Sequence, residues 1–187
     1  AIDERDELGN LTGTFGASDF AVAFGIAKTA SPGLRLGGAL QWTHEDLAGD
    51  GASAFALSAG GLYALPSVPG LTLGASLRNL GSSPSFKAAD GTDGASVSQP
   101  FTFEAGASYG KTKWRAAADL VKLKGDDMEE RLGLEVRPMA ALALRAGYMI
   151  GLDAADFTAG AGFTAGRFDI DYAFVPYHDD LGSSHRF

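Results

Sequence analysis

Large apolar residues alternate with very small residues along most of the chain. In the first clear run, the large residues Phe20, Val22, Phe24 and Ile26 alternate with the small residues Ala21, Ala23, Gly25 and Ala27. We call each set of alternate positions in such a run a parity. Consecutive side chains of a β-strand point to opposite faces, so the alternation predicts a strand with two unlike faces. The same texture predicts ten strands between about Phe15 and Pro176, and an eleventh that starts near His185.

The composition matches this pattern. The chain has 26 glycines in 187 residues, about twice the usual fraction of roughly 7%, and 32 alanines. Side chains this small cannot fill a close-packed core of ordinary thickness. The length favours one domain, residues 1–187, built either as a thin wall or from a repeated element.

The charged residues lie almost entirely on the parity of the small residues. In a soluble β-sandwich, the solvent-exposed face would be rich in Lys, Glu and Thr. In a transmembrane barrel the apolar parity faces lipid, and the small and ionic parity faces the lumen. We therefore predict a lumen-facing charged set: Arg35, Arg78, Glu104, Arg115, Asp119, Arg131, Glu135, Arg145, Arg167, Asp169 and Asp171. The predicted lipid-facing set is Phe20, Val22, Phe24, Ile26, Leu40, Trp42, Leu71, Leu73, Phe101, Phe103, Trp114, Leu144, Phe157, Phe168, Ile170 and Tyr172.

The predicted connections alternate in length, as they do in outer-membrane barrels with short turns at one rim and longer loops at the other. The short ones are Lys28–Gly33, Pro66–Gly70, Gly110–Thr112, Pro138–Ala140 and Ala165–Gly166. Between them come Glu45–Ala52, Gly81–Gln99, Gly125–Met128, Gly151–Asp156 and Tyr177–Ser184, most of them longer and all acidic or rich in Gly, Asp and Ser. The predicted fold class is an all-β, antiparallel up-and-down transmembrane β-barrel. A soluble sandwich or barrel and a repetitive or filament-forming β protein are the alternatives.

The composition disfavours several kinds of function. The chain has no cysteine, which excludes disulfides, thiolate metal sites and cysteine nucleophiles. A net charge of -8 repels phosphate backbones, so we expect no nucleic-acid partner. Three histidines do not indicate a metalloprotein.

Two motifs suggest chemistry in isolation. Gly106–Gly110 matches the G-x-S-x-G pattern around Ser108, but that nucleophile needs a strand, a sharp turn and a helix, and the following segment alternates as a strand. Asp90 and Asp93 resemble half of a calcium loop without its bidentate glutamate, and an Asp/Gly-rich turn explains them equally well. We predict no catalytic residue, no cofactor and no metal site beyond this weak calcium candidate, and therefore no enzyme.

Several short strings resemble one family. They are Phe15–Asp19, Ser76–Gly81, Ala118–Lys122, Leu144–Tyr148 and, most specifically, Asp171–Tyr177 followed by Asp180–Phe187. Together they resemble the PorV/PorQ family of outer-membrane proteins, relatives of the FadL transporters, over essentially the whole chain.

The resemblance implies a place in the bacterial outer membrane and a 14-stranded barrel. We expect this chain to be the C-terminal portion of such a barrel, without the first strands and the end of the last one. PorV-like members act with type IX secretion machinery, which implies an accessory or shuttle role with a translocon or secreted cargo as partner. The alternatives are a FadL-like transporter of hydrophobic small molecules and a structural β protein that assembles through open strand edges.

Overall fold

The computed structural model describes residues 2–87, 92–96, 99–151, 156–178 and 181–187. The strands are β1 (Ile2–Arg5), β2 (Leu11–Phe15), β3 (Ala17–Ser31), β4 (Leu34–Leu47), β5 (Asp50–Ala64), β6 (Leu71–Gly81), β7 (Ser85–Lys87), β8 (Asp93–Ser96), β9 (Thr102–Lys111), β10 (Trp114–Leu123), β11 (Met128–Met139), β12 (Leu142–Ile150), β13 (Phe157–Ala165), β14 (Phe168–Pro176) and β15 (Ser183–Arg186). Within the described residues, no helix is long and apolar enough to cross a membrane.

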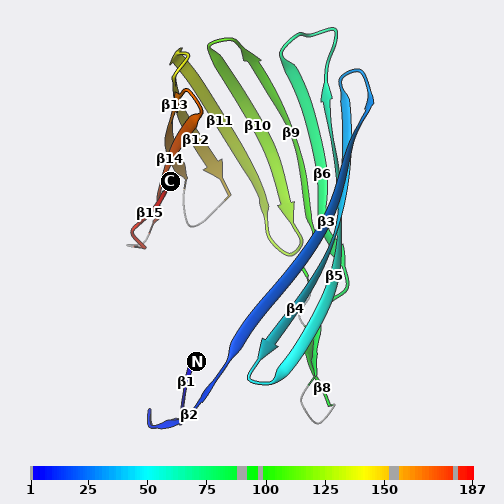
Figure 1. The fold of residues 1–187 in the computed structure, drawn as a ribbon, viewed down its shortest axis with the longest axis vertical. Coiled ribbons are helices and arrows are strands. Elements are labelled where there is room, and N and C mark those ends of the chain that lie inside the picture. Colours follow the sequence, from blue (N-terminus) through cyan, green and yellow to red (C-terminus); the bar gives the residue numbers. More distant parts are fainter. Residues whose placement is uncertain (1, 88–91, 97–98, 152–155, 179–180) are drawn as a thin grey trace. The chain divides into compact units, whose positions relative to one another are not determined.

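The strands form an up-and-down sheet. Eleven of them follow one hydrogen-bonded path in the order β15, β14, β13, β12, β11, β10, β9, β6, β5, β4 and β3, while β7 pairs with β5 and β8. Each of β9 to β14 lies beside its neighbour in sequence (Figure 1). The eleven strands on this path confirm the predicted all-β, antiparallel up-and-down fold.

The described residues contain very little core. The buried apolar side chains are small or of moderate size: Ala52, Ala54, Ala56, Val121 and Ala143. No large side chain among them is fully buried, whereas Phe24 and Phe168 are 75% and 74% exposed. Soluble proteins place such residues inside, so a sheet that shows this many of them needs an apolar environment around it.

Chain contacts divide the protein into two compact units. The first comprises residues 1–27, 37–59 and 77–101. In it, β1 and β2 form a separate antiparallel hairpin, with Ile2 opposite Phe15. Along β5, buried Ala52, Ala54 and Ala56 alternate with exposed residues that include Phe55 and Leu57, so this strand has one covered and one open face.

The second unit comprises residues 28–36, 60–76 and 102–187 and contains β9 to β15 complete. Two-residue turns join β9 to β10, β11 to β12 and β13 to β14, as the alternation of connection lengths predicts. The opposite connections, Lys124–Asp127, Gly151–Asp156 and Tyr177–Gly182, are longer.

Several of the predicted boundaries are wrong. The expected connection Lys28–Gly33 is only Pro32 and Gly33, because β3 continues to Ser31. Three further segments differ. The expected loop Glu45–Ala52 is a two-residue hairpin turn at Ala48 and Gly49, whose φ angles of 57° and 90° fit the type I′ geometry that matches strand twist. The expected loop Gly81–Gln99 contains β7 and β8, and the residues before Phe15 form β1 and β2. All three segments are polar, so they lack the apolar alternation from which strands are inferred.

Candidate functional site

The strand register of β9 to β15 gathers most of the predicted charged residues on one side of this part of the sheet. Residues directly opposite in neighbouring strands lie on the same face. Asp119 lies opposite Arg131, Glu135 opposite Arg145, and Gly162 opposite Asp171. We call this side the polar face; its members include Glu104, Ser108, Arg115, Asp119, Arg131, Glu135, Arg145, Thr158, Gly160, Gly162, Asp169, Asp171 and Arg186.

The remaining residues of the predicted charged set lie elsewhere. Arg35 is in β4 and Arg78 is in β6. Arg167 belongs to the two-residue turn between β13 and β14, so its expected place in a strand is wrong by one position. The turn begins at Gly166, whose φ of 64° already leaves the extended conformation.

The predicted lipid-facing residues lie mainly opposite one another or open to the surroundings. In the second unit, Leu144 is opposite Val136 and Ile170 opposite Phe163, and all four side chains are exposed. In the first unit, the Phe20 ring packs edge-on against Trp42 at 5.9 Å. Phe101 precedes β9, and the other predicted members lie in β3, β4, β6, β9, β10, β13 and β14: Val22, Phe24, Ile26, Leu40, Leu71, Leu73, Phe103, Trp114, Phe157, Phe168 and Tyr172.

A row of ion pairs crosses the polar face. Glu135 accepts hydrogen bonds from Arg137 Nε and from Arg145 Nε, each at 2.8 Å. The Nη1 group of Arg145 donates to Asp171 Oδ1. The Arg145 side chain is 39% exposed, so solvent screens the row only in part. Arg145 thus joins β11 to β14 and passes over β13, which lies between β12 and β14.

Glycine makes room for this crossing. Arg145 lies opposite Gly160, and Asp171 lies opposite Gly162. A Cβ atom on Gly162 would be 2.6 Å from Asp171 Oδ1 and 3.1 Å from Arg145 Nη1. The absence of a side chain on β13 is therefore what lets the guanidinium reach the carboxylate.

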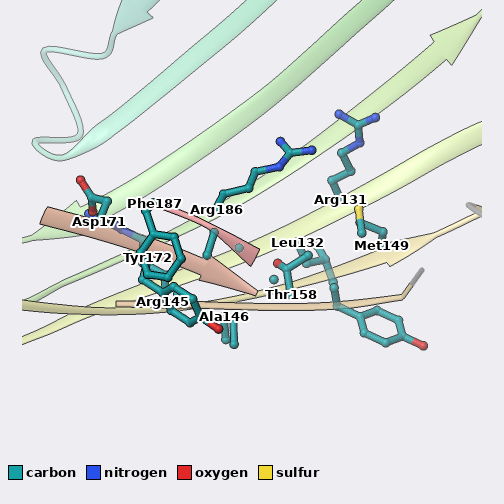
Figure 2. A pocket seen from close by; sticks show the side chains of 16 residues that line it. Arg131, Leu132, Arg145, Ala146, Met149, Thr158, Asp171, Tyr172, Arg186 and Phe187 are labelled. Atoms are coloured by element: carbon teal, nitrogen blue, oxygen red, sulfur yellow. Dashed lines mark hydrogen bonds and ion pairs between the residues drawn. The ribbon is translucent and has the colours of Figure 1, made fainter. Parts of the chain in front are cut away.

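Two pockets lie along these strands, and both are lined by Arg145 and Asp171. The larger, of about 590 Å³, is bordered by Met149 and Thr158 near the long connections (Figure 2). Arg131 and Arg186 extend from the same side of the strands in Figure 2. The smaller, of about 310 Å³, is bordered by Ala140 and Ala141 at the β11–β12 turn.

An aromatic cluster occupies the other side of β14 and β15. The Tyr172 hydroxyl and His185 Nδ1 are 2.8 Å apart, and Ser183 Oγ lies 3.1 Å from His185 Nε2. The Tyr172 and Phe187 rings lie with centroids 5.2 Å apart. Since Arg186 opposes Ala173 on the polar face, this cluster projects from the opposite face.

Sequence reasoning missed several residues of the polar face. Arg137 shares the parity of Glu135, but it lies next to Pro138, where the sequence predicts a turn. Arg186 falls in the last residues, where too little alternation remains to fix a face. The role of Gly160 and Gly162 in the crossing depends on a pairing register that no local pattern reveals.

The motifs that suggested chemistry do not form a reactive site in the described part of the chain. Ser108 lies inside β9, opposite Ala117, so the G-x-S-x-G pattern has a strand on both sides. Asp90 lies outside the described residues, and Asp93 lies in β8, where it pairs with Lys87 of β7. Among the described residues, no group of three or more His, Cys, Asp or Glu could hold a metal ion.

Comparison with known proteins finds likeness in structure only. No protein family and no curated protein matches the sequence. The structure resembles the Pseudomonas putida toluene transporter TodX with a TM-score of 0.61 and 12% identity, over 85% of this chain and 63% of that one. It also resembles the CymD monoaromatic hydrocarbon channel with a TM-score of 0.58 and 13% identity, over 85% of this chain and 69% of that one.

At such low identity the likeness shows the fold, which is that of transmembrane β-barrel transporters. It does not show a PorV or PorQ relationship. Both neighbours are described as transport proteins and not as enzymes. The chain spans less than two thirds of the length of TodX.

Proposed function

We propose that this chain forms part of the wall of a bacterial outer-membrane β-barrel that passes small hydrophobic molecules. The observation that carries the proposal is the shared fold with a toluene transporter and a monoaromatic hydrocarbon channel, each over 85% of this chain. The accessory role in protein secretion has no comparable support, so the transporter alternative of the sequence analysis becomes the preferred function.

The two unlike faces support the membrane placement. A barrel that spans a bilayer shows lipid an apolar band and encloses a polar interior. The exposed residues Phe168, Ile170, Leu144 and Phe157 supply such a band on β12 to β14. The polar face would then line the lumen.

The larger pocket supports the solute class. Small-molecule sites in proteins are concave spaces of about 300–1,000 Å³ that are mainly apolar with a few polar groups. The pocket of about 590 Å³ falls in this range. Glycine and alanine contribute many of its lining residues and its surface is mainly apolar, so a hydrocarbon that enters it would leave water for an apolar environment, which is favourable.

Uptake of radiolabelled toluene by whole bacteria tests this function. We expect cells that display the complete protein in their outer membrane to take up toluene several-fold faster than cells with an empty vector. Cells that display an unrelated barrel at equal abundance control for general leakiness. Before the assay, the protein should stay in the outer-membrane fraction after a carbonate wash and migrate faster on a gel when unheated.

Three outcomes would count against the proposal. Uptake equal to that of the unrelated barrel would remove the transport function. Co-purification of a secretion translocon or cargo from native membranes, without toluene uptake, would restore the accessory role in secretion. A protein that stays soluble without detergent and assembles into fibres would favour the structural alternative.

A further inference from the structure

We propose that β11 to β15 carry a site for an apolar solute, and that the ion-pair row Glu135–Arg145–Asp171 forms one boundary of this site. We call this boundary the end wall. It determines which solutes fit. This inference rests on the proposed function and adds to it a named site and a size limit. In it, the larger pocket holds an uncharged hydrocarbon, and the row keeps that hydrocarbon out of the smaller pocket. In this proposal Arg145 positions the row and thereby determines which solutes fit the site.

The row lies at the border of the two pockets. Arg145 and Asp171 line both spaces. The surface of the larger pocket is mainly apolar, although Arg131 and Arg186 also line it, and the surface of the smaller pocket is mainly polar, although Phe163 and Ile170 line it. The larger pocket continues toward the long connections over Gly133, Gly147 and Gly160. The smaller one continues toward the short turns beside charged and hydroxyl side chains, namely Arg137, Thr164 and Asp169. A solute that moves from the larger pocket toward the smaller one therefore meets the row at the border between the mainly apolar and the mainly polar lining.

Contact with the charged row is unfavourable for an apolar group because of the water that hydrates the row. Charged side chains that are partly exposed keep hydrating water, and a hydrocarbon placed over them would remove this water without replacing its hydrogen bonds. Glu135, Arg145 and Asp171 are 23%, 39% and 61% exposed, so water can reach each of them in the absence of a solute. Of these groups, Arg145 and Asp171 line both pockets, and the hydration lost at these two makes the border unfavourable for an alkyl chain or a ring.

The row is held as one unit from both sides. Arg137 binds Glu135 from the side of the smaller pocket, and Arg145 binds the second carboxylate oxygen of Glu135. Asp171 fixes the far end of Arg145 across β13. Because the gap that admits Arg145 exists only while position 162 has no side chain, Gly162 controls whether the row is closed.

Gly162→Ala tests the end wall with little risk to folding. The atoms that the new methyl group would meet are the ends of the Asp171 and Arg145 side chains, which can move aside. The methyl group should separate the two and connect the pockets. We propose to measure binding of toluene and of 1-phenyldodecane to the purified complete protein in lipid nanodiscs, with empty nanodiscs subtracted.

The wild-type protein should bind toluene and discriminate against 1-phenyldodecane, whose chain must pass the row. We expect Gly162→Ala to reduce this discrimination about tenfold, the equivalent of about 1.4 kcal/mol. Asp171→Asn, which keeps the shape of the side chain and removes its charge, should shift the ratio in the same direction by less. Gly25→Ala is the matched control, because its methyl group would meet ordinary contacts, the nearest at 3.6 Å.

An unchanged binding ratio in both Gly162→Ala and Asp171→Asn would overturn the end wall, as would a wild-type protein that binds neither probe. The outcome is separable from that of the uptake assay. Toluene uptake with an unchanged ratio would leave the transport function standing without the end wall. A shifted ratio without uptake would leave a hydrocarbon site with this border in a protein that does not transport toluene.

Discussion

Replacing Ala118 by arginine is expected to lower the free energy of unfolding of the protein in lipid vesicles by about 2–4 kcal/mol. Ala118 lies in the middle of β10, opposite Ala107 and Leu132, and its side chain is exposed on the apolar side of the sheet. In the proposed barrel this position faces the hydrocarbon interior of the bilayer. A guanidinium there would lose its hydration and would have no acidic neighbour to replace it.

The adjacent residue supplies a matched control. Ala117 has the same side chain but lies opposite Ser108 and Gly133, on the polar face. Its neighbours two positions away in the strand are Arg115 and Asp119. We expect Ala117→Arg to cost less than about 1 kcal/mol, as substitutions in hydrated surroundings usually do.

Equilibrium urea unfolding of both variants in vesicles, followed by tryptophan fluorescence, measures the difference. The comparison is sensitive to the assignment of the faces because the two substitutions differ by a single residue in one strand. Equal losses would show that both sides of β10 meet similar surroundings, which contradicts a membrane wall. A larger loss for Ala117→Arg would reverse the assignment of the two faces.

Most of the strand architecture could be predicted from sequence because the two faces meet different surroundings. Phe168, Ile170 and Tyr172 alternate with Arg167, Asp169 and Asp171, and a period of two arises in no other regular structure. The short turns were also predictable, since glycine or proline stands at or beside most of them. The alternation ends where both faces are polar, which explains why the sequence predicts a loop and not a hairpin around Ala48.

The candidate site could be predicted only in part. That Glu135, Arg145 and Asp171 share a face follows from their parity within each strand. That Arg145 binds Asp171 and not a residue of β13 depends on the register of three strands and on the empty position at Gly162. Such contacts join residues far apart in sequence, and no local pattern contains them. The resemblance of short strings likewise implied a membrane barrel, but the secretion role that it also implied has no support in the structural likeness.

The substitution Gly70→Ala is expected to cause one of the largest losses of stability that a single methyl group can produce in this chain. Gly70 ends the connection between β5 and β6 with a φ of 97°, a conformation that costs an L-residue about 1–2 kcal/mol. Its carbonyl also accepts a hydrogen bond of 3.1 Å from the Gly110 amide at the end of β9. A Cβ atom at this position would collide with the carbonyl oxygen of Gly110.

The collision matters because the obstacle is backbone and not a movable side chain. To admit the methyl group, the end of β9 must move away and give up its bond to Gly70, and a backbone group left without a partner costs a further ~1–3 kcal/mol. The contact between Gly70 and Gly110 also lies beside the pairing of β6 with β9. These two strands are neighbours in the sheet, although the long segment 82–101 separates them in sequence. Losing it should therefore weaken this strand pairing as well as the turn.

The variant Gly166→Ala measures the backbone strain of a positive φ without a collision between the methyl group and neighbouring backbone. Gly166 also has a positive φ, 64°, but a Cβ atom there would meet nothing within 4 Å. We expect this variant to lose only the ~1–2 kcal/mol of backbone strain, and Gly70→Ala to lose more. The fraction of protein that migrates as the compact band on unheated gels, measured along a urea series, compares the two. If the variants unfold at the same urea concentration, the Gly110 contact contributes nothing, and the β6–β9 pairing must be fixed by the strands themselves.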